Sequence, residues 1–171
     1  MPVSDAPRLV VMGVSAVGKS SVAAALADRL GVPWADADEL HPPENVAKMA
    51  SGIPLTDADR WPWLDRVGQV LAAGADTGVI VACSALRRVY RDRLRDAAPS
   101  AEFIHLAGEE HVLVARSRAR EGHFMPPSLI ASQLATLEQL GDDEVGLVVG
   151  VDATVTDIVE SVVGWMQSHD G

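Results

Sequence analysis

The sequence contains a single cysteine, Cys83, among its 171 residues. A lone cysteine excludes a disulfide within the chain and is typical of a reducing compartment, so we expect a cytoplasmic protein. No run approaches the roughly 18 apolar residues that a membrane-spanning helix requires. Residues 1–8 lack the basic and apolar regions of a signal peptide. These absences predict a soluble, intracellular protein without a membrane partner.

Basic residues are also scarce, because 14 Lys and Arg stand against 24 Asp and Glu and the net charge is −10. A protein that binds nucleic acid through its overall charge carries the opposite sign, so we expect no nucleic-acid partner. Lys19 and Lys48 are the only lysines among these 14 residues. Either an arginine-rich coding bias accounts for this, or lysine is retained where arginine cannot replace it.

Short apolar segments alternate with helical patterns along the chain. Such short apolar strands are typical of a parallel sheet buried on both faces, and the length favours one domain, 1–171. The sequence therefore predicts a three-layer α/β/α fold with a five-stranded parallel sheet. We expect the helix at 85–97 to bury Val89 and to carry Arg91 on its polar face. The predicted strands are 9–12, 32–35, 79–82, 103–106 and 145–151, and the predicted helices are 19–30, 44–50, 62–73, 85–97, 109–120, 128–139 and a last one from 154.

Residues 13–20 match the pattern G-x-x-x-x-G-K-[ST] at every fixed position, between a predicted strand and a predicted helix. The glycines let the backbone curl so that N–H groups surround phosphate oxygens, and the helix adds its positive N-terminal end. Lys19 can reach the β- and γ-phosphates, and the Ser20 hydroxyl can bind Mg²⁺. We therefore expect ATP and Mg²⁺ as ligands. The predicted nucleotide-binding residues are Gly13, Val14, Ser15, Ala16, Val17, Gly18, Lys19, Ser20 and Ser21.

The phosphate loop alone does not choose between a kinase, a GTPase switch and a motor. The N-K-x-D motif of guanine recognition is absent from the sequence, and the strand at 79–82 runs into Cys83 and Ser84 where motors carry an acidic residue. These two observations favour a small-molecule kinase.

Two carboxylates, Asp36 and Asp38, follow the second predicted strand, at the edge where parallel sheets bind ligands. One could hold Mg²⁺ through water, and the other could orient or deprotonate an attacking hydroxyl. We assign Asp36, with Ser20, to the metal and Asp38 to catalysis, although either could be the nearer to the metal. The alternative is a solvated turn with a helix cap.

Arg116 and Arg120 are four residues apart on one face of a predicted helix, just before a loop with Gly122. They could clamp the transferring phosphoryl group as a lid closes; a basic helix surface is the alternative. His105 lies in an apolar strand, and we expect it to be a hydrogen-bonded core residue.

Several segments beyond the phosphate loop resemble the gluconate kinases, also called thermoresistant gluconokinases, of the phosphate-loop kinase superfamily. Two departures are Ala16 and Val17, where glycine and serine or cysteine are frequent. A third is Gln139, where the family commonly has proline. None of these removes a charged or donor group. The resembling segments are 38–42, 48–55, 57–60, 62–64, 83–86, 90–92, 120–125, 132–133 and 136–138.

The resemblance implies ATP-dependent phosphorylation of D-gluconate at its 6-hydroxyl, giving 6-phosphogluconate and ADP. It also implies a fold like that of shikimate and nucleoside monophosphate kinases, with a substrate-side segment at about 38–74, a mobile lid at about 120–128 and, in many members, a homodimer. Gluconate is an anion, and the candidate cations for its carboxylate are Arg60, Lys48 and His41, with His123 of the lid. The loop at 152–153 is where adenine would lie.

Two other functions stay open. A kinase for shikimate or another polyol acid would share the fold and the phosphate loop. A nucleotide sensor would bind ATP without turning over any sugar acid.

Overall fold

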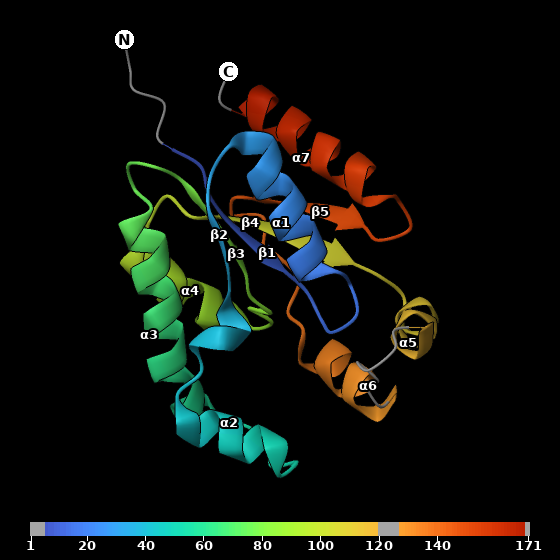
Figure 1. Ribbon diagram of the computed structural model, residues 1–171. Coiled ribbons are helices and arrows are strands. Elements are labelled where there is room, and N and C mark those ends of the chain that lie inside the picture. Colours follow the sequence, from blue (N-terminus) through green and yellow to red (C-terminus); the bar gives the residue numbers. More distant parts are fainter. Residues whose placement is uncertain (1–5, 120–126, 170–171) are drawn as a thin grey trace.

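The computed structural model describes residues 6–119 and 127–169. Within them, one sheet of five parallel strands has the order β2-β3-β1-β4-β5 (Figure 1). The central strand β1 pairs with β3 on one side and β4 on the other, so that Val10 lies between Val81 and Phe103. The strands are β1 (Arg8–Met12), β2 (Trp34–Asp36), β3 (Val79–Ala82), β4 (Glu102–Ala107) and β5 (Gly146–Gly150).

Helices cover both faces of the sheet, which confirms the predicted three-layer α/β/α arrangement. On one face α1 and α7 pack against Leu9 and Val11 of β1. On the other face α3 and α4 pack against Val10 and Met12. The helices are α1 (Lys19–Leu30), α2 (Pro43–Ala50), α3 (Asp57–Ala73), α4 (Arg88–Ala97), α5 (Glu110–Ala119), α6 (Pro127–Thr136) and α7 (Val155–His169), with a 3₁₀ turn at Ala37–Leu40. None of them is both long and apolar enough, within the described residues, to cross a membrane.

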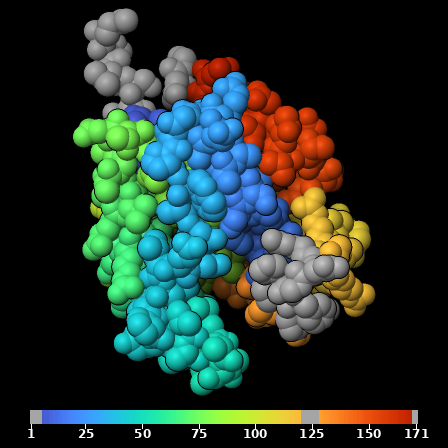
Figure 2. All heavy atoms as spheres, in the orientation of Figure 1, coloured from blue at the N-terminus to red at the C-terminus, as the bar shows by residue number. Residues whose placement is uncertain are grey.

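Helices α2, α5 and α6 lie at one end of the layered body, and α6 is attached to it through Ile130, which is buried in the core. In Figure 1, α5 and α6 lie beyond the carboxyl ends of β4 and β1, at the end of the molecule opposite the chain termini. Figure 2 shows α2 projecting from the same end. These elements therefore surround the sheet edge at which the phosphate loop begins.

Several predicted boundaries were wrong. Helix α3 begins at Asp57 and not at Pro62, because Thr56 and Asp59 form a capping box: the Thr56 hydroxyl accepts from the Asp59 amide at 3.2 Å, and the Asp59 carboxylate accepts from the Thr56 amide at 2.9 Å. Helix α4 begins at Arg88 and not at 85, because Ala85 has a left-handed conformation with φ 45°.

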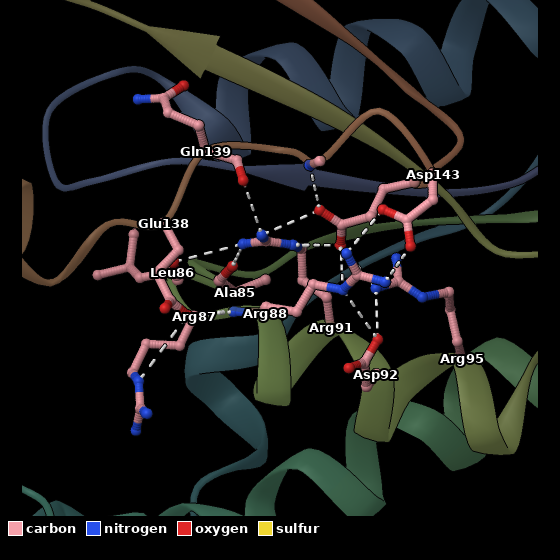
Figure 3. A network of polar contacts seen from close by, with 12 residues as sticks. Ala85, Leu86, Arg87, Arg88, Arg91, Asp92, Arg95, Glu138, Gln139 and Asp143 are labelled. Carbon is pink, nitrogen blue, oxygen red and sulfur yellow. Dashed lines mark hydrogen bonds and ion pairs between the residues drawn. The ribbon is translucent and has the colours of Figure 1, made fainter.

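The expected faces of α4 also need correction. Val89, predicted to be buried, is 42% exposed, and Arg91, predicted to lie on a polar face, is 0% exposed. Arg91 is buried because the segment before β5 folds over α4 and brings Glu144 to it, with Nε and Oε1 2.8 Å apart (Figure 3). His105 is buried as expected, but its Nδ1 atom has no hydrogen-bond partner in the part of the chain that the structure describes.

Candidate active site

The phosphate loop connects β1 to α1 at the centre of the sheet. Its first glycine, Gly13, has φ 147°, and a Cβ there would lie 2.8 Å from the carbonyl oxygen of Leu106. Gly18 has φ 91°, and no described side chain caps the N-terminus of α1 at this residue. The helix end is therefore available to an anion such as a phosphate group.

Lys19 lies at the end of the loop and reaches back across it. Its Nζ donates to the carbonyl oxygen of Val14 at 3.0 Å. The next amide, that of Ser15, donates to Oε1 of Gln133 on α6 at 2.6 Å. Ala16 has a left-handed φ of 71°, which is a conformation that glycine adopts more readily. The loop is thus held closed by one of its own side chains and by a side chain from α6.

Ser20, in the first turn of α1, is in contact with the end of β2. Its hydroxyl donates to Oδ2 of Asp36 at 2.9 Å, while Oδ1 of Asp36 accepts from the Asp38 amide at 3.0 Å. The chain does not stay extended after Asp36, because a 3₁₀ turn begins at Ala37. Asp36 therefore caps this turn, as the alternative interpretation expected, and also reaches the proposed metal-binding hydroxyl.

The donor set fits Mg²⁺. This ion usually takes only one or two protein oxygens and completes its octahedron with phosphates and waters. Ser20 and Asp36 supply two converging oxygens beside the phosphate loop. Among the described residues there is no cluster of three or more His, Cys, Asp or Glu side chains that could hold a metal on its own. Any Mg²⁺ at this position would therefore be shared with the nucleotide.

Cys83 lies near the predicted charged residues of the site. It is buried at the end of β3, and burial raises the pKa of its thiol to about 12. The charges of Asp38, Lys19 and Asp36 all act on this thiol. Lys19 of α1, Asp36 of β2 and Asp38 of the 3₁₀ turn thus all lie near enough to this thiol to act on it electrostatically. The Asp38 carboxylate itself is exposed, and it forms no hydrogen bond or ion pair with the described residues.

His41 lies flat against Trp63, with ring centroids 4.2 Å apart and an interplanar angle of 14°. Burial lowers the pKa of His41, against an opposing effect of the nearby Asp38 charge. The lowered pKa favours the neutral ring over the cation, and the prediction that His41 binds gluconate stays a prediction. The Asn45 amide nitrogen lies 3.2 Å from Nδ1 and donates to the Asp59 carbonyl oxygen at 2.9 Å. Because that nitrogen only donates, Nδ1 must accept and Nε2 carries the proton.

The other two candidate cations, Lys48 and Arg60, differ in how many of their donors are already bonded within the protein. Lys48 pairs with Asp59 at 2.8 Å, and this hydrogen bond is the main reason that the pKa of Asp59 falls to about 2. Arg60 donates from Nη1 to the Leu55 carbonyl oxygen at 2.9 Å and to the Tyr90 hydroxyl at 3.1 Å. Its Nε and Nη2 atoms donate to no described residue. Arg60 thus retains donors for a ligand, whereas Lys48 is largely neutralised.

A cavity of about 560 Å³ opens at the carboxyl ends of β4 and β5. Arg116 of α5 lies beside it and donates to the carbonyl oxygen of Val151. Arg116 is therefore directed toward the loop after β5 and not toward the phosphate loop. Arg120 and His123 lie outside the described residues, so the predicted clamp stays a prediction. The cavity is lined by Ala107, Gly108, Glu109, Val112, Val151 and Asp152.

Comparison with known proteins identifies the family. The family model described as adenylylsulphate kinase matches residues 7–125. Gluconokinase of Gluconobacter oxydans is 47% identical to this chain, over 96% of it and 94% of the relative. Thermoresistant gluconokinase of Escherichia coli is 42% identical over 90% of each chain. The chain belongs to the gluconokinase family. It is accordingly a kinase, with ATP as a substrate.

Solved structures agree with this assignment. A gluconokinase from Sinorhizobium meliloti superposes with a TM-score of 0.83 at 50% identity, covering 90% of this chain and 87% of the other. Shikimate kinase from Aquifex aeolicus superposes with a TM-score of 0.58 at 15% identity, over 95% and 98% of the two chains. The second likeness shows the fold alone, and it confirms the predicted fold like that of shikimate kinases.

Two residues at the site of this gluconokinase family member, Asn45 and Gln133, were not predicted from the sequence. Asn45 is 3% exposed and orients His41, but nothing in the local pattern distinguishes it from a surface residue of α2. Gln133 contacts the phosphate loop from 118 positions away. Its segment was noted only as part of the resemblance, which was the one signal that could have found it.

Proposed function

We propose that the protein transfers the γ-phosphoryl group of ATP to the 6-hydroxyl of D-gluconate, giving 6-phosphogluconate and ADP. The observation that carries this proposal is the contact between Ser20 of the phosphate loop and Asp36 at the end of β2, 2.9 Å apart, in a chain that is 47% identical to a gluconokinase along nearly its whole length.

On the nucleotide side, Lys19 and the loop amides hold the β- and γ-phosphates, apart from the amides of Gly13 and Ser15, which donate to Ser84 and Gln133. Ser20 and Asp36 would hold Mg²⁺, which would neutralise negative charge on the phosphates during transfer. The cavity beside β4 and β5 accommodates the adenine, with Arg116 against it. Arg120 is left as the arginine that stabilises charge on the transferring group.

On the acceptor side, Asp38 orients the gluconate hydroxyl or accepts its proton. Its carboxylate is exposed and has no partner within residues 6–119 and 127–169, which supports this role because an acceptor can approach it. Arg60 binds the gluconate carboxylate, since its Nε and Nη2 donors have no partner among the described residues. His41 donates from Nε2 to a hydroxyl group, and Lys48 and His123 are the remaining residues predicted to bind gluconate.

A second acceptor is suggested by the adenylylsulphate kinase model that matches residues 7–125. Identity of 42–47% to gluconokinases over at least 90% of the chain favours gluconate. Shikimate kinase shares only the fold, at 15% identity.

A coupled ADP-release assay with Mg·ATP tests the proposal. The acceptors are gluconate, adenylyl sulfate, shikimate, glycerate, glucose and AMP. The variants are Lys19→Ala and Asp38→Asn, with Glu39→Gln as the control because Glu39 is the neighbouring exposed carboxylate. We expect turnover with gluconate alone, lost in both variants and retained in the control.

Turnover with a different acceptor would overturn the substrate while keeping the mechanism. ATP binding without turnover of any acceptor would overturn the kinase proposal in favour of a sensor. Full activity of Asp38→Asn would remove Asp38 from the reacting hydroxyl.

A further inference from the structure

One peptide unit of the phosphate loop is held from both sides. The carbonyl oxygen of Val14 accepts from Lys19 Nζ at 3.0 Å, and the N–H of Ser15, in the same peptide plane, donates to Gln133 Oε1 at 2.6 Å. A trans peptide directs its oxygen and its N–H in opposite directions. Lys19 and Gln133 therefore hold opposite edges of one rigid plane, and together they fix its orientation.

Gln133 is itself held by the body of the protein. Ile130, one turn earlier on α6, is 0% exposed in the core, and Leu134 packs against the same core. After α6 ends, the Glu138 amide donates to the Leu86 carbonyl oxygen at 2.7 Å, and the Glu138 carboxylate accepts from the Arg88 amide at 2.7 Å. The Gln133 side chain thus extends from a helix that is anchored on both sides of it.

We infer that Gln133 is a positioning residue for phosphoryl transfer: it fixes the Val14–Ser15 peptide, and this peptide in turn fixes the ammonium group of Lys19. A residue that touches the loop only through a neutral acceptor atom suits this position, because a carboxylate there would add negative charge beside the phosphates. The inference rests on the use of ATP by this loop and does not depend on which acceptor is phosphorylated.

Two substitutions at Gln133 distinguish the effect of losing the hydrogen-bond acceptor from the effect of adding a negative charge. Gln133→Met keeps the length of the side chain and removes the acceptor, and Gln133→Glu keeps the acceptor and adds a charge. Gln139→Met is the matched control, because Gln139 is exposed and contacts Arg91 only through its backbone oxygen (Figure 3). Steady-state kinetics with ATP and the proposed acceptor, and calorimetric titration with Mg·ATP, give the readouts.

For Gln133→Met we expect kcat/KM for ATP to fall about tenfold, which corresponds to the loss of one hydrogen bond. The KM for the acceptor and the unfolding temperature are expected to stay unchanged. For Gln133→Glu we expect the Kd of Mg·ATP to rise about tenfold or more. Gln139→Met is expected to match the wild type in every measurement. If Gln133→Met fails to fold, Gln133→Glu carries the test, since it keeps the contact.

A double-mutant cycle with Lys19→Ala tests whether Gln133 affects ATP binding through Lys19. Because calorimetry measures ATP binding without turnover, it also serves the inactive variant. We expect Gln133→Met to change the Kd of ATP much less in the Lys19→Ala background than in the wild type. An equal change in both backgrounds would overturn the inference. Tighter ATP binding by Gln133→Met would also overturn it, because it would make Gln133 a competitor of the phosphates. Absence of acceptor turnover in the wild type would refute the proposed function without affecting this binding cycle.

Discussion

Replacing Glu144 with glutamine should destabilise the protein strongly, because it would leave the Arg91 charge buried without a carboxylate. Both side chains are 0% exposed, and they form two hydrogen bonds, Nε to Oε1 at 2.8 Å and Nη2 to Oε2 at 3.1 Å. Arg95 adds a third, at 2.6 Å (Figure 3). Glutamine has nearly the same shape, so the change removes the charge and one acceptor without opening a cavity.

Breaking one partner of a buried ion pair costs about 3–5 kcal/mol. In a protein of this size each kcal/mol lowers the unfolding temperature by about 2–4 °C, so we expect Glu144→Gln to unfold about 10 °C lower. Urea unfolding followed by circular dichroism measures the free energy directly. The control is Asp143→Asn, since Asp143 is 70% exposed and solvent screens its pair with Arg88, which should therefore contribute little to stability. Equal losses in the two variants would refute the reasoning.

The same carboxylate predicts a dependence on pH. Burial raises the pKa of Glu144, but hydrogen bonds from Arg91, the Gly141 amide and Arg95 outweigh burial and hold it at about 2, below its ordinary 4.5. Its contribution to stability is therefore complete above about pH 4.5 and is lost as the pH falls toward 2. The slope of unfolding free energy against pH should be smaller in Glu144→Gln over this window. An unchanged slope would contradict the assignment.

Three further predictions concern the site. Cys83 should resist Ellman's reagent in the native protein and react in urea, because its thiol is buried and has a pKa of about 12; rapid native labelling would contradict its burial. Ala16→Gly should change the unfolding free energy by less than about 1 kcal/mol, whereas Ala16→Val should lower it by more, because β-branched residues disfavour a φ of 71°; urea titration of both variants measures the difference. Nitrogen-15 NMR should find the proton of His41 on Nε2 in the wild type, and Asn45→Leu should lose this preference and raise the KM for gluconate; a proton on Nδ1 in the wild type would exclude the proposed role of Asn45.

The elements around the phosphate loop were predicted because their signals are local. The apolar run before Gly13, the fixed spacing to Lys19 and the periodic helix that follows all lie within about one strand–helix unit. Helix α3 was predicted less well, because Pro62 was interpreted as its first turn while the capping box at Thr56 went unnoticed.

Features that depend on contacts between residues far apart in the sequence could not be predicted. A buried arginine has the same helical periodicity as an exposed one, and the partner that makes burial of Arg91 possible, Glu144, is 53 positions away. Lys48 was recognised as a cation, but its neutralisation depends on Asp59 across the turn between α2 and α3. Periodicity and spacing describe single elements, so they do not reveal which elements meet.

The strand order divides the two ligands of this enzyme between opposite halves of the sheet. β1 with its phosphate loop is central, the segment after β2 and the start of α3 carry the residues proposed for the acceptor, and β4 and β5 border the cavity proposed for adenine. Within the described residues, the lining of that cavity contains no residue from the segment between β2 and α3. Substitutions in that segment could therefore alter the acceptor while leaving the lining of the proposed adenine cavity unchanged.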